Sequence, residues 1–188
     1  MTDDSKPKTI KELQKEIPSI RDVGQRLAMA LRAEDYKADM LSANLLEYML
    51  KKAIITKFIP LGNDPLESIF SDGGNGPLST FSAKIKLAYA LGIVSAETRL
   101  QIERVKEIRN HFAHHKDKVS FKDPSVISVC GFFKQRKGLP LKESILTMKM
   151  PTPKVMYVQT CFFVALDFKM YIKRLGTIDP MELPIDSF

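Results

Sequence analysis

Apolar residues recur along this chain at spacings of three and four positions, which is the repeat of an amphipathic helix. The repeat is clearest between Gln101 and His115, where one stripe holds Ile102, Val105, Ile108 and Phe112. No run between turn residues alternates with period two, and only residues 119–121 and 145–150 carry weak strand signals. We therefore predict an all-α fold, a helical bundle of about six to seven helices.

Capping side chains at helix starts, and glycine or proline residues at helix ends, set the expected boundaries. The longest helices are expected over about 19–34, 35–58, 80–91, 95–115 and 152–175. A chain of 188 residues is long enough for one domain with a real core and too short for two comfortable ones. We predict a single helical domain over residues 1–175, followed by an acidic tail over 176–188.

The helix expected over 35–58 is apolar on nearly all sides in its middle. Its exceptions are Asn44 and Glu47, which lie three positions apart and therefore share a face. A carboxylate in such a helix needs a cationic partner, because burying an unpaired charge costs free energy. We predict a largely buried ion pair between Glu47 and Arg109.

The formal net charge of +7 favours the approach of acidic partners, because it attracts them over long distances. The most basic segment lies between Phe133 and Pro151, and a solvated surface is the ordinary interpretation of such a run. If the protein binds nucleic acid there, the candidate side chains are Lys134, Arg136, Lys137 and Lys142.

Features of the chain favour a soluble protein of the cytoplasm that does not enter a membrane. The first residues are charged and contain no apolar core of a signal peptide. The longest apolar run, Val155 to Leu166, is shorter than the roughly 20 residues that span a bilayer. Cys130 and Cys161 lie in apolar segments without a C-x-x-C spacing, which suits a reducing compartment and predicts buried, inert thiols.

All three histidines follow Arg109 and Asn110 at the end of the helix expected over 95–115. One interpretation is a metal-independent ribonuclease. His114 could take the proton of a ribose 2′-hydroxyl, and Arg109 could stabilise the charge that develops on the phosphate. These residues lie about 140° apart on an ideal helix, and one histidine leaves the second proton-transfer role unfilled. This interpretation therefore requires a homodimer.

Two other interpretations of the histidine cluster stay open. Glu107, His111 and His115 recur every four positions and could converge on one metal ion, although no fourth ligand is evident. Alternatively the cluster is structural, with Arg109 paired to Glu47 while Asn110 and His114 bind carbonyl groups near the helix end. We expect neither a metal nor a cofactor.

Several blocks of the sequence resemble the mannitol operon repressor family. They are GNDPL at 62–66, NGPLSTFSAKIKLAYALG at 75–92, EIRNHFAHH at 107–115 and SFKDP at 120–124. The resemblance implies an all-α regulator of the transcription of genes for mannitol uptake and catabolism. The chain shows no helix-turn-helix pattern, so a regulator that acts through a protein or nucleic-acid partner fits its residues better than one that binds DNA by itself.

The segment from Arg109 to His114 is also similar to the R-x4-6-H motif of the HEPN superfamily. That similarity implies a HEPN-like helical fold, and its members include metal-independent ribonucleases that work as dimers and others that only bind partners. It would assign catalysis to Arg109 and His114, with Asn110 orienting them. We expect a non-enzymatic regulator first and a HEPN-type ribonuclease or nucleotide-binding homodimer as the alternative.

Overall fold

The computed structural model describes residues 9–71, 75–114, 119–134 and 151–175, and the regular elements in these ranges are all helices. They are α1 (Ile10–Glu16), α2 (Ile20–Arg32), α3 (Asp35–Ile55), α4 (Asn63–Phe70), α5 (Phe81–Ala90), α6 (Ala96–His114), α7 (Pro124–Cys130) and α9 (Pro153–Leu175). The all-α class that the apolar periodicity predicts is confirmed.

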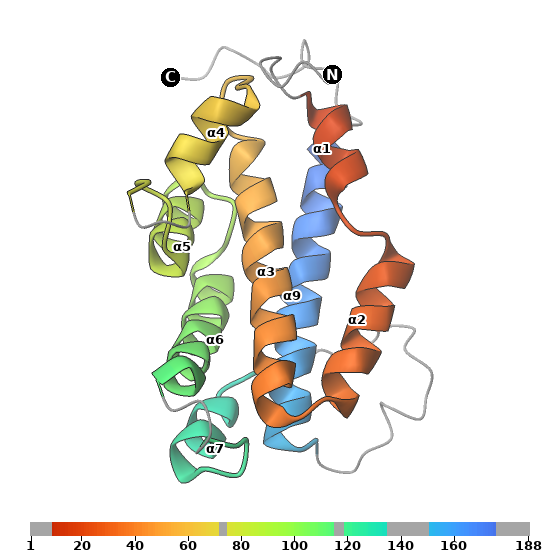
Figure 1. The fold of residues 1–188 in the computed structure, drawn as a ribbon, viewed down its shortest axis with the longest axis vertical. Coiled ribbons are helices and arrows are strands. Elements are labelled where there is room, and N and C mark those ends of the chain that lie inside the picture. Colours follow the sequence, from red (N-terminus) through yellow and green to blue (C-terminus); the bar gives the residue numbers. More distant parts are fainter. Residues whose placement is uncertain (1–8, 72–74, 115–118, 135–150, 176–188) are drawn as a thin grey trace.

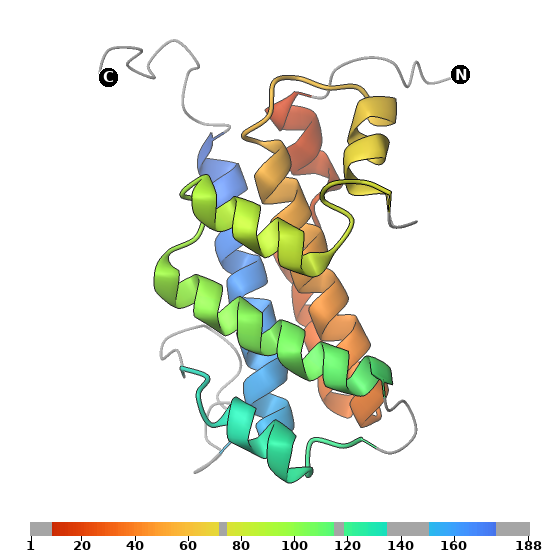
Figure 2. The same cartoon turned by 90° about the vertical axis from the view of Figure 1, so that its left-hand side faces the viewer.

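The two longest helices, α3 and α9, lie side by side along the long axis of the molecule (Figure 1). Helices α1 and α2 pack on one side of this pair, and α5 and α6 pack on the other. Figure 2 shows α5 and α6 crossing in front of α3 and α9, with α7 beside the start of α9. The end of α6, where His111 and His114 lie, is therefore close to both α3 and α7.

The helix starts follow from local side-chain chemistry. Ser19 and Asp22 form a capping box at the start of α2, in which the Asp22 backbone N–H donates to Ser19 Oγ at 3.1 Å. Thr80 caps α5 by accepting from the backbone N–H of Ala83, also at 3.1 Å. At the other end of α5, Gly92 has a φ of 66°, which an L side chain rarely adopts.

Some predicted boundaries were wrong by a few residues. Helix α3 ends at Ile55 instead of Phe58, and α7 ends at Cys130, whereas the sequence from the Asp123-Pro124 start predicts a short helix to about Phe133. In both places the following N–H groups donate to carbonyls three residues back, as from Phe58 to Ile55, so the last turn tightens and leaves the α-helix.

The weak strand signal at residues 119–121 was also wrong. The backbone N–H of Ser120 donates to Asp123 Oδ2 and that of Phe121 donates to Asp35 Oδ2. The carboxylates of Asp123 and Asp35 therefore accept from the backbone N–H groups that a strand would use to bond a neighbouring strand. The second weak candidate, residues 145–150, lies outside the described residues, as does the tail over 176–188.

The apolar stripe of α6 faces the core, as predicted, and its four residues are at most 1% exposed. Phe112 at the end of the stripe packs on Phe121 with ring centroids 5.0 Å apart, and Phe121 packs on Tyr157 at 5.3 Å. By length and apolar composition α9 could cross a membrane, but most of its most apolar stretch is buried inside the bundle. Helix α9 is a core helix of this fold.

Candidate functional site

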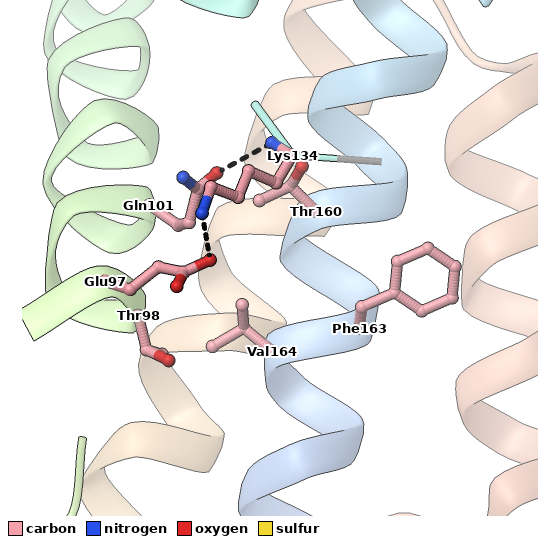
Figure 3. A pocket seen from close by; sticks show the side chains of 7 residues that line it. All are labelled: Glu97, Thr98, Gln101, Lys134, Thr160, Phe163 and Val164. Carbon is pink, nitrogen blue, oxygen red and sulfur yellow. Dashed lines mark hydrogen bonds and ion pairs between the residues drawn. The ribbon is translucent and has the colours of Figure 1, made fainter. Parts of the chain in front are cut away.

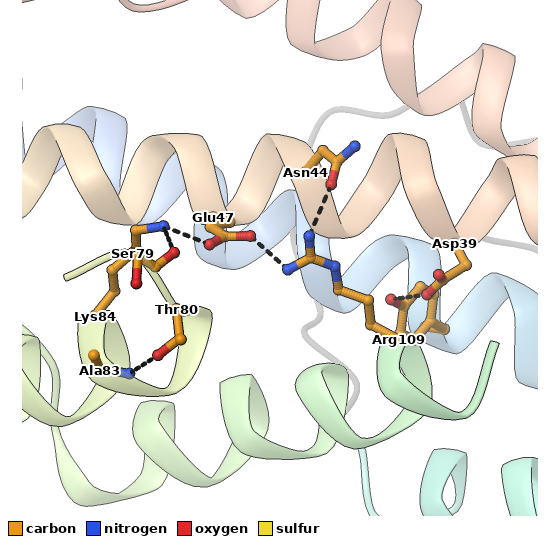
Figure 4. A network of polar contacts seen from close by, with 9 residues as sticks. Asp39, Asn44, Glu47, Ser79, Thr80, Ala83, Lys84 and Arg109 are labelled. Atoms are coloured by element: carbon orange, nitrogen blue, oxygen red, sulfur yellow. Dashed lines mark hydrogen bonds and ion pairs between the residues drawn. The ribbon is translucent and has the colours of Figure 1, made fainter. Parts of the chain in front are cut away.

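Arg109 leaves α6 toward α3, where Glu47 and Asn44 meet it (Figure 4). Its Nη1 lies 2.5 Å from Glu47 Oε2, and its Nη2 donates to Asn44 Oδ1 at 3.4 Å. The guanidinium carbon also lies 5.6 Å from the centroid of the Phe81 ring. The ion pair predicted from the sequence is thus present, and the two polar residues that interrupt the apolar middle of α3 both contact Arg109.

Glu47 has a second cationic partner, Lys84 of α5. Lys84 Nζ lies 2.6 Å from Glu47 Oε1 and donates to the carbonyl of Ser79 at 3.2 Å. The Lys84 side chain is only 4% exposed, compared with 16% for Glu47 and 32% for Arg109. The burial predicted for the Glu47–Arg109 pair therefore holds for the carboxylate, whereas Arg109 keeps about a third of its side chain in solvent.

Lys84 was not predicted as a partner, although a signal for it is present in the sequence. It stands in the buried stripe of α5, between Phe81 and Ile85 at helical spacing. A lysine in an apolar stripe needs a carboxylate for the same reason that Glu47 needs a cation. The need of Glu47 for a cation and that of Lys84 for a carboxylate together predict the Glu47–Lys84 pair.

Asn110 and His114 lie on another side of α6 from the Glu47 network. Together with Glu107, His111 and Ser125 they line a groove between α6 and α7 that encloses about 260 Å³. Its apolar walls are Ile108, Val126 and Val129. Ser125 Oγ lies 3.4 Å from His111 Nε2. The groove offers imidazole, amide and carboxylate groups for hydrogen bonding.

The structure separates the two residues of the R-x4-H motif within one chain. Arg109 is held by Glu47 and Asn44, whereas His114 is exposed and lines the groove beside α7. Their angular offset of about 140° on the helix accounts for this arrangement.

The metal interpretation is only partly covered by the described residues. Glu107 and His111 do line one groove, but His115 lies outside the described part of the chain. Among the described residues, no group of three or more histidine, cysteine, aspartate or glutamate side chains could hold a metal ion. We assign no metal ligands.

A buried acid not predicted from the sequence lies on α3 about two helical turns before Glu47. Asp39 of α3 is 2% exposed and accepts a hydrogen bond of 2.5 Å from the hydroxyl of Tyr157 on α9. Burial raises the pKa of Asp39 from 3.8 to about 6, while the Tyr157 hydrogen bond and the charge of Arg109 oppose that rise. Asp39 therefore titrates just below neutral pH.

Cys130 and Cys161 are buried free thiols, as the apolar segments around them predict. Burial raises the pKa of Cys130 to about 12 and that of Cys161 well above its ordinary value. Neither forms a thiolate near neutral pH, so neither is a nucleophile under those conditions.

Of the candidate nucleic-acid-binding residues, the structure describes only Lys134. Its ammonium group pairs with Glu97 (Figure 3). The Lys134 Nζ to Glu97 Oε1 distance is 2.8 Å, and both side chains are largely exposed. The Lys134 backbone N–H donates to Gln101 Oε1 at 3.3 Å. Lys134 therefore forms an ion pair with Glu97 on the protein surface. The other three candidates, Arg136, Lys137 and Lys142, lie outside the described residues.

Comparison with known proteins gave two matches. A family model described as "Mannitol repressor" matches residues 65–163, a range that runs from α4 into α9 and contains Lys84, Arg109 and the α6–α7 groove. The X-ray structure of the MtlR-HPr complex from Escherichia coli contains a chain of the same fold, with a TM-score of 0.56 and 14% sequence identity. The match covers 78% of this chain and 98% of that chain. A search of curated proteins gave no match.

Proposed function

This chain belongs to the mannitol repressor family, and from that membership we propose that it regulates transcription of mannitol-operon genes in the cytoplasm by binding a protein partner. The observation that carries the proposal is the family match over residues 65–163, which covers more than half of the chain. A protein partner is supported by the likeness of fold to an MtlR whose structure was solved as a complex with HPr.

The proposal assigns Arg109 to the architecture of the protein. Its guanidinium is engaged by Glu47 and Asn44, so it fixes the end of α6 against α3. Contact between nucleic acid and the segment that holds Lys134, Arg136, Lys137 and Lys142 stays a prediction, as does a homodimer.

Partner binding is tested by isothermal titration of the full chain with HPr from the same organism. We expect saturable binding to one site, with an affinity of roughly micromolar strength because regulatory contacts are transient. The titration is run at two temperatures, since a binding enthalpy near zero at one of them would hide the reaction. Absence of heat at both temperatures would contradict the proposal, and an unrelated small protein of equal charge serves as the control.

A HEPN-type ribonuclease is the second candidate. It is favoured by the shared groove of Asn110 and His114 and by the exposed third of the Arg109 side chain. It is opposed by the separation of Arg109 from His114, which would have to be bridged by a second copy of the chain.

Our proposal predicts that the purified protein does not cleave a mixed RNA pool in EDTA. Cleavage by the parent protein that is lost in His114→Ala and kept in His111→Ala would instead establish the ribonuclease, because His111 lies in the same groove but outside the motif. Circular dichroism confirms that each variant folds, and sedimentation of the active species tests the homodimer that this mechanism requires.

A further inference from the structure

Helices α2 and α3 are joined by a short turn and run side by side (Figure 1). An apolar groove lies between them. We call it the α2–α3 groove. Its lining residues are Met29 and Arg32 of α2, Ala33 at the C-cap of α2, and Lys37, Met40, Leu41 and Asn44 of α3. Both sets follow the three- and four-residue spacing of a helix face, so the groove follows the helices and encloses about 580 Å³.

The groove exposes large apolar side chains from both walls. Met29 is 59% exposed and Met40 is 42% exposed, and Leu41 lies partly buried beside them. Single exposed apolar side chains are common on protein surfaces, but two on facing walls of one hollow indicate a surface that binds something apolar. Methionine suits that use, because its unbranched and polarizable side chain adapts to different partners.

The rim of the groove is cationic. Arg32 stands on one wall and Lys37 on the other. The carboxylate of Glu34 lies 3.8 Å from Lys37 Nζ, but both side chains are more than two-thirds exposed. An exposed pair of this kind is weak, so Lys37 can bind another carboxylate. At one end of the groove, Asn44 accepts a hydrogen bond from Arg109 and links the groove to the Glu47 network.

We infer that the α2–α3 groove docks an amphipathic helix of a protein partner. The apolar stripe of that helix would lie on Met29, Met40 and Leu41, and acidic residues beside the stripe would meet Arg32 and Lys37. An amphipathic helix places its apolar face in a hydrophobic groove, and complementary charges at the edge add specificity. The inference rests on the proposed function, because it gives the partner-binding regulator the surface for its partner.

Two other occupants fit the groove less well. A second copy of this chain placed there by two-fold symmetry would bring Arg32 and Lys37 against another pair of cations. A nucleic acid would meet a floor without aromatic rings, because the lining residues contain none on which a base could stack.

The test uses two synthetic helical peptides of about 18 residues, long enough for several helical turns. Both carry the same leucine stripe, and they differ only in flanking residues, glutamate in one and lysine in the other. Fluorescence anisotropy measures their binding to the full chain. We expect the glutamate peptide to bind at least about tenfold more tightly, with a difference that shrinks as salt is added. Equal binding of the two peptides, or binding of neither, would overturn the inference.

Substitutions locate the binding on the surface. Met40→Glu should weaken binding of the glutamate peptide at least about tenfold, since it places a charge in the floor and repels the acidic flanks. Met170→Glu is the matched control, because Met170 is 44% exposed on α9 and does not line the groove. Arg32→Glu should reverse the preference between the peptides, whereas Arg21→Glu, on an exposed position of the same helix, should not. Equal effects of a test variant and its control would overturn the inference.

Two other occupants of the α2–α3 groove, a second copy of the chain and the chain's own tail, would give different results. If the Met40→Glu variant has a lower sedimentation coefficient than the parent protein, a second copy of the chain fills the groove. If replacing Asp179, Glu182 and Asp186 by their amides in the full chain tightens peptide binding, the chain's own acidic tail competes for the groove. Either result would overturn the assignment to a partner.

Failure of the inference and failure of the proposed function give different results. If the glutamate peptide binds and HPr does not, the α2–α3 groove is still a docking surface for a helix, but HPr is not the partner. If HPr binds and the two peptides bind equally, HPr is the partner, but the α2–α3 groove is not its docking surface.

Discussion

Replacing Glu47 by alanine is expected to lower the free energy of unfolding by about 3 to 5 kcal/mol. The substitution removes the carboxylate that lies between Lys84 and Arg109. The Lys84 side chain is 4% exposed, and among the described residues it then keeps only the Ser79 carbonyl as a hydrogen-bond partner. Its charge would then be buried without compensation, which is far more costly than losing an ion pair in solvent. Urea denaturation followed by circular dichroism measures the change.

The matched control for Glu47 is Glu103, which pairs with Lys106 on the surface of α6. The side chains of that pair are 31% and 25% exposed, so Glu103→Ala should cost at most about 1 kcal/mol. A double-mutant cycle tests the reason for the larger effect. In a Lys84→Met background, Glu47→Ala should cost less, because only the partly exposed Arg109 is left unpaired. Equal costs for Glu47 and Glu103, or an unchanged cost in that background, would contradict this account.

The effect of Glu47→Ala bears on every functional assay of this region. A variant that releases Arg109 loosens the contact between the end of α6 and α3, and α6 carries Asn110 and His114. Lost stability could then be mistaken for a lost binding or catalytic group, so folding has to be established for each variant first.

Replacing Asp39 by asparagine is expected to change how stability depends on pH. The pKa of Asp39 is raised from 3.8 to about 6 in the folded protein, so the folded state holds this proton more tightly than the unfolded state. The stability contributed by the protonated acid is fully present below pH 3.8 and is lost as the pH rises through about 6. A rise of that size corresponds to about 3 kcal/mol.

Asparagine has no charge to bury and can still accept the hydrogen bond from Tyr157. The free energy of unfolding of Asp39→Asn, relative to that of the parent, should therefore rise by up to about 3 kcal/mol between pH 4 and pH 7. It should then stay constant toward pH 8. Denaturation curves at several pH values measure this difference, and a flat difference over the whole range would contradict the raised pKa.

Two variants control the Asp39 experiment. Tyr157→Phe removes the hydrogen bond that lowers the pKa of Asp39, so the loss of stability should move to higher pH. Asp22→Asn should give a pH dependence of opposite sign. Hydrogen bonds with Ser19 lower the pKa of Asp22 below 3.8, so its contribution is present above that pH and is lost as the pH falls.

The helical architecture could be predicted because its causes are local. The stripe from Ile102 to Phe112 and the capping box of Ser19 with Asp22 are read from residues three and four positions apart. The predicted helix ends were less accurate. The last turn before Phe58 tightens through a hydrogen bond from the Phe58 N–H to the Ile55 carbonyl, and that change depends on the path of the chain after the helix. The ion pair of Glu47 with Arg109 was predicted across 62 residues of sequence, since a carboxylate in an apolar helix demands a cation and Arg109 was a candidate for that role.

Other features depended on which helix faces meet, and only the tertiary structure decided them. Lys84 and Glu47 are 37 residues apart, and Tyr157 and Asp39 are 118 apart. Local spacing shows that such a group needs a partner, but it does not choose among partners on distant helices. The same holds for the α2–α3 groove, whose walls are ordinary helix faces until they pack side by side. The sequence by itself determined where helices form and which side chains must be buried or paired, because these follow from short-range periodicity and from the cost of burying charge. The packing of α3 against α2, α5, α6 and α9 decided the ion pairs, the Asp39–Tyr157 hydrogen bond and the α2–α3 groove, because those contacts form only when separate helices pack together.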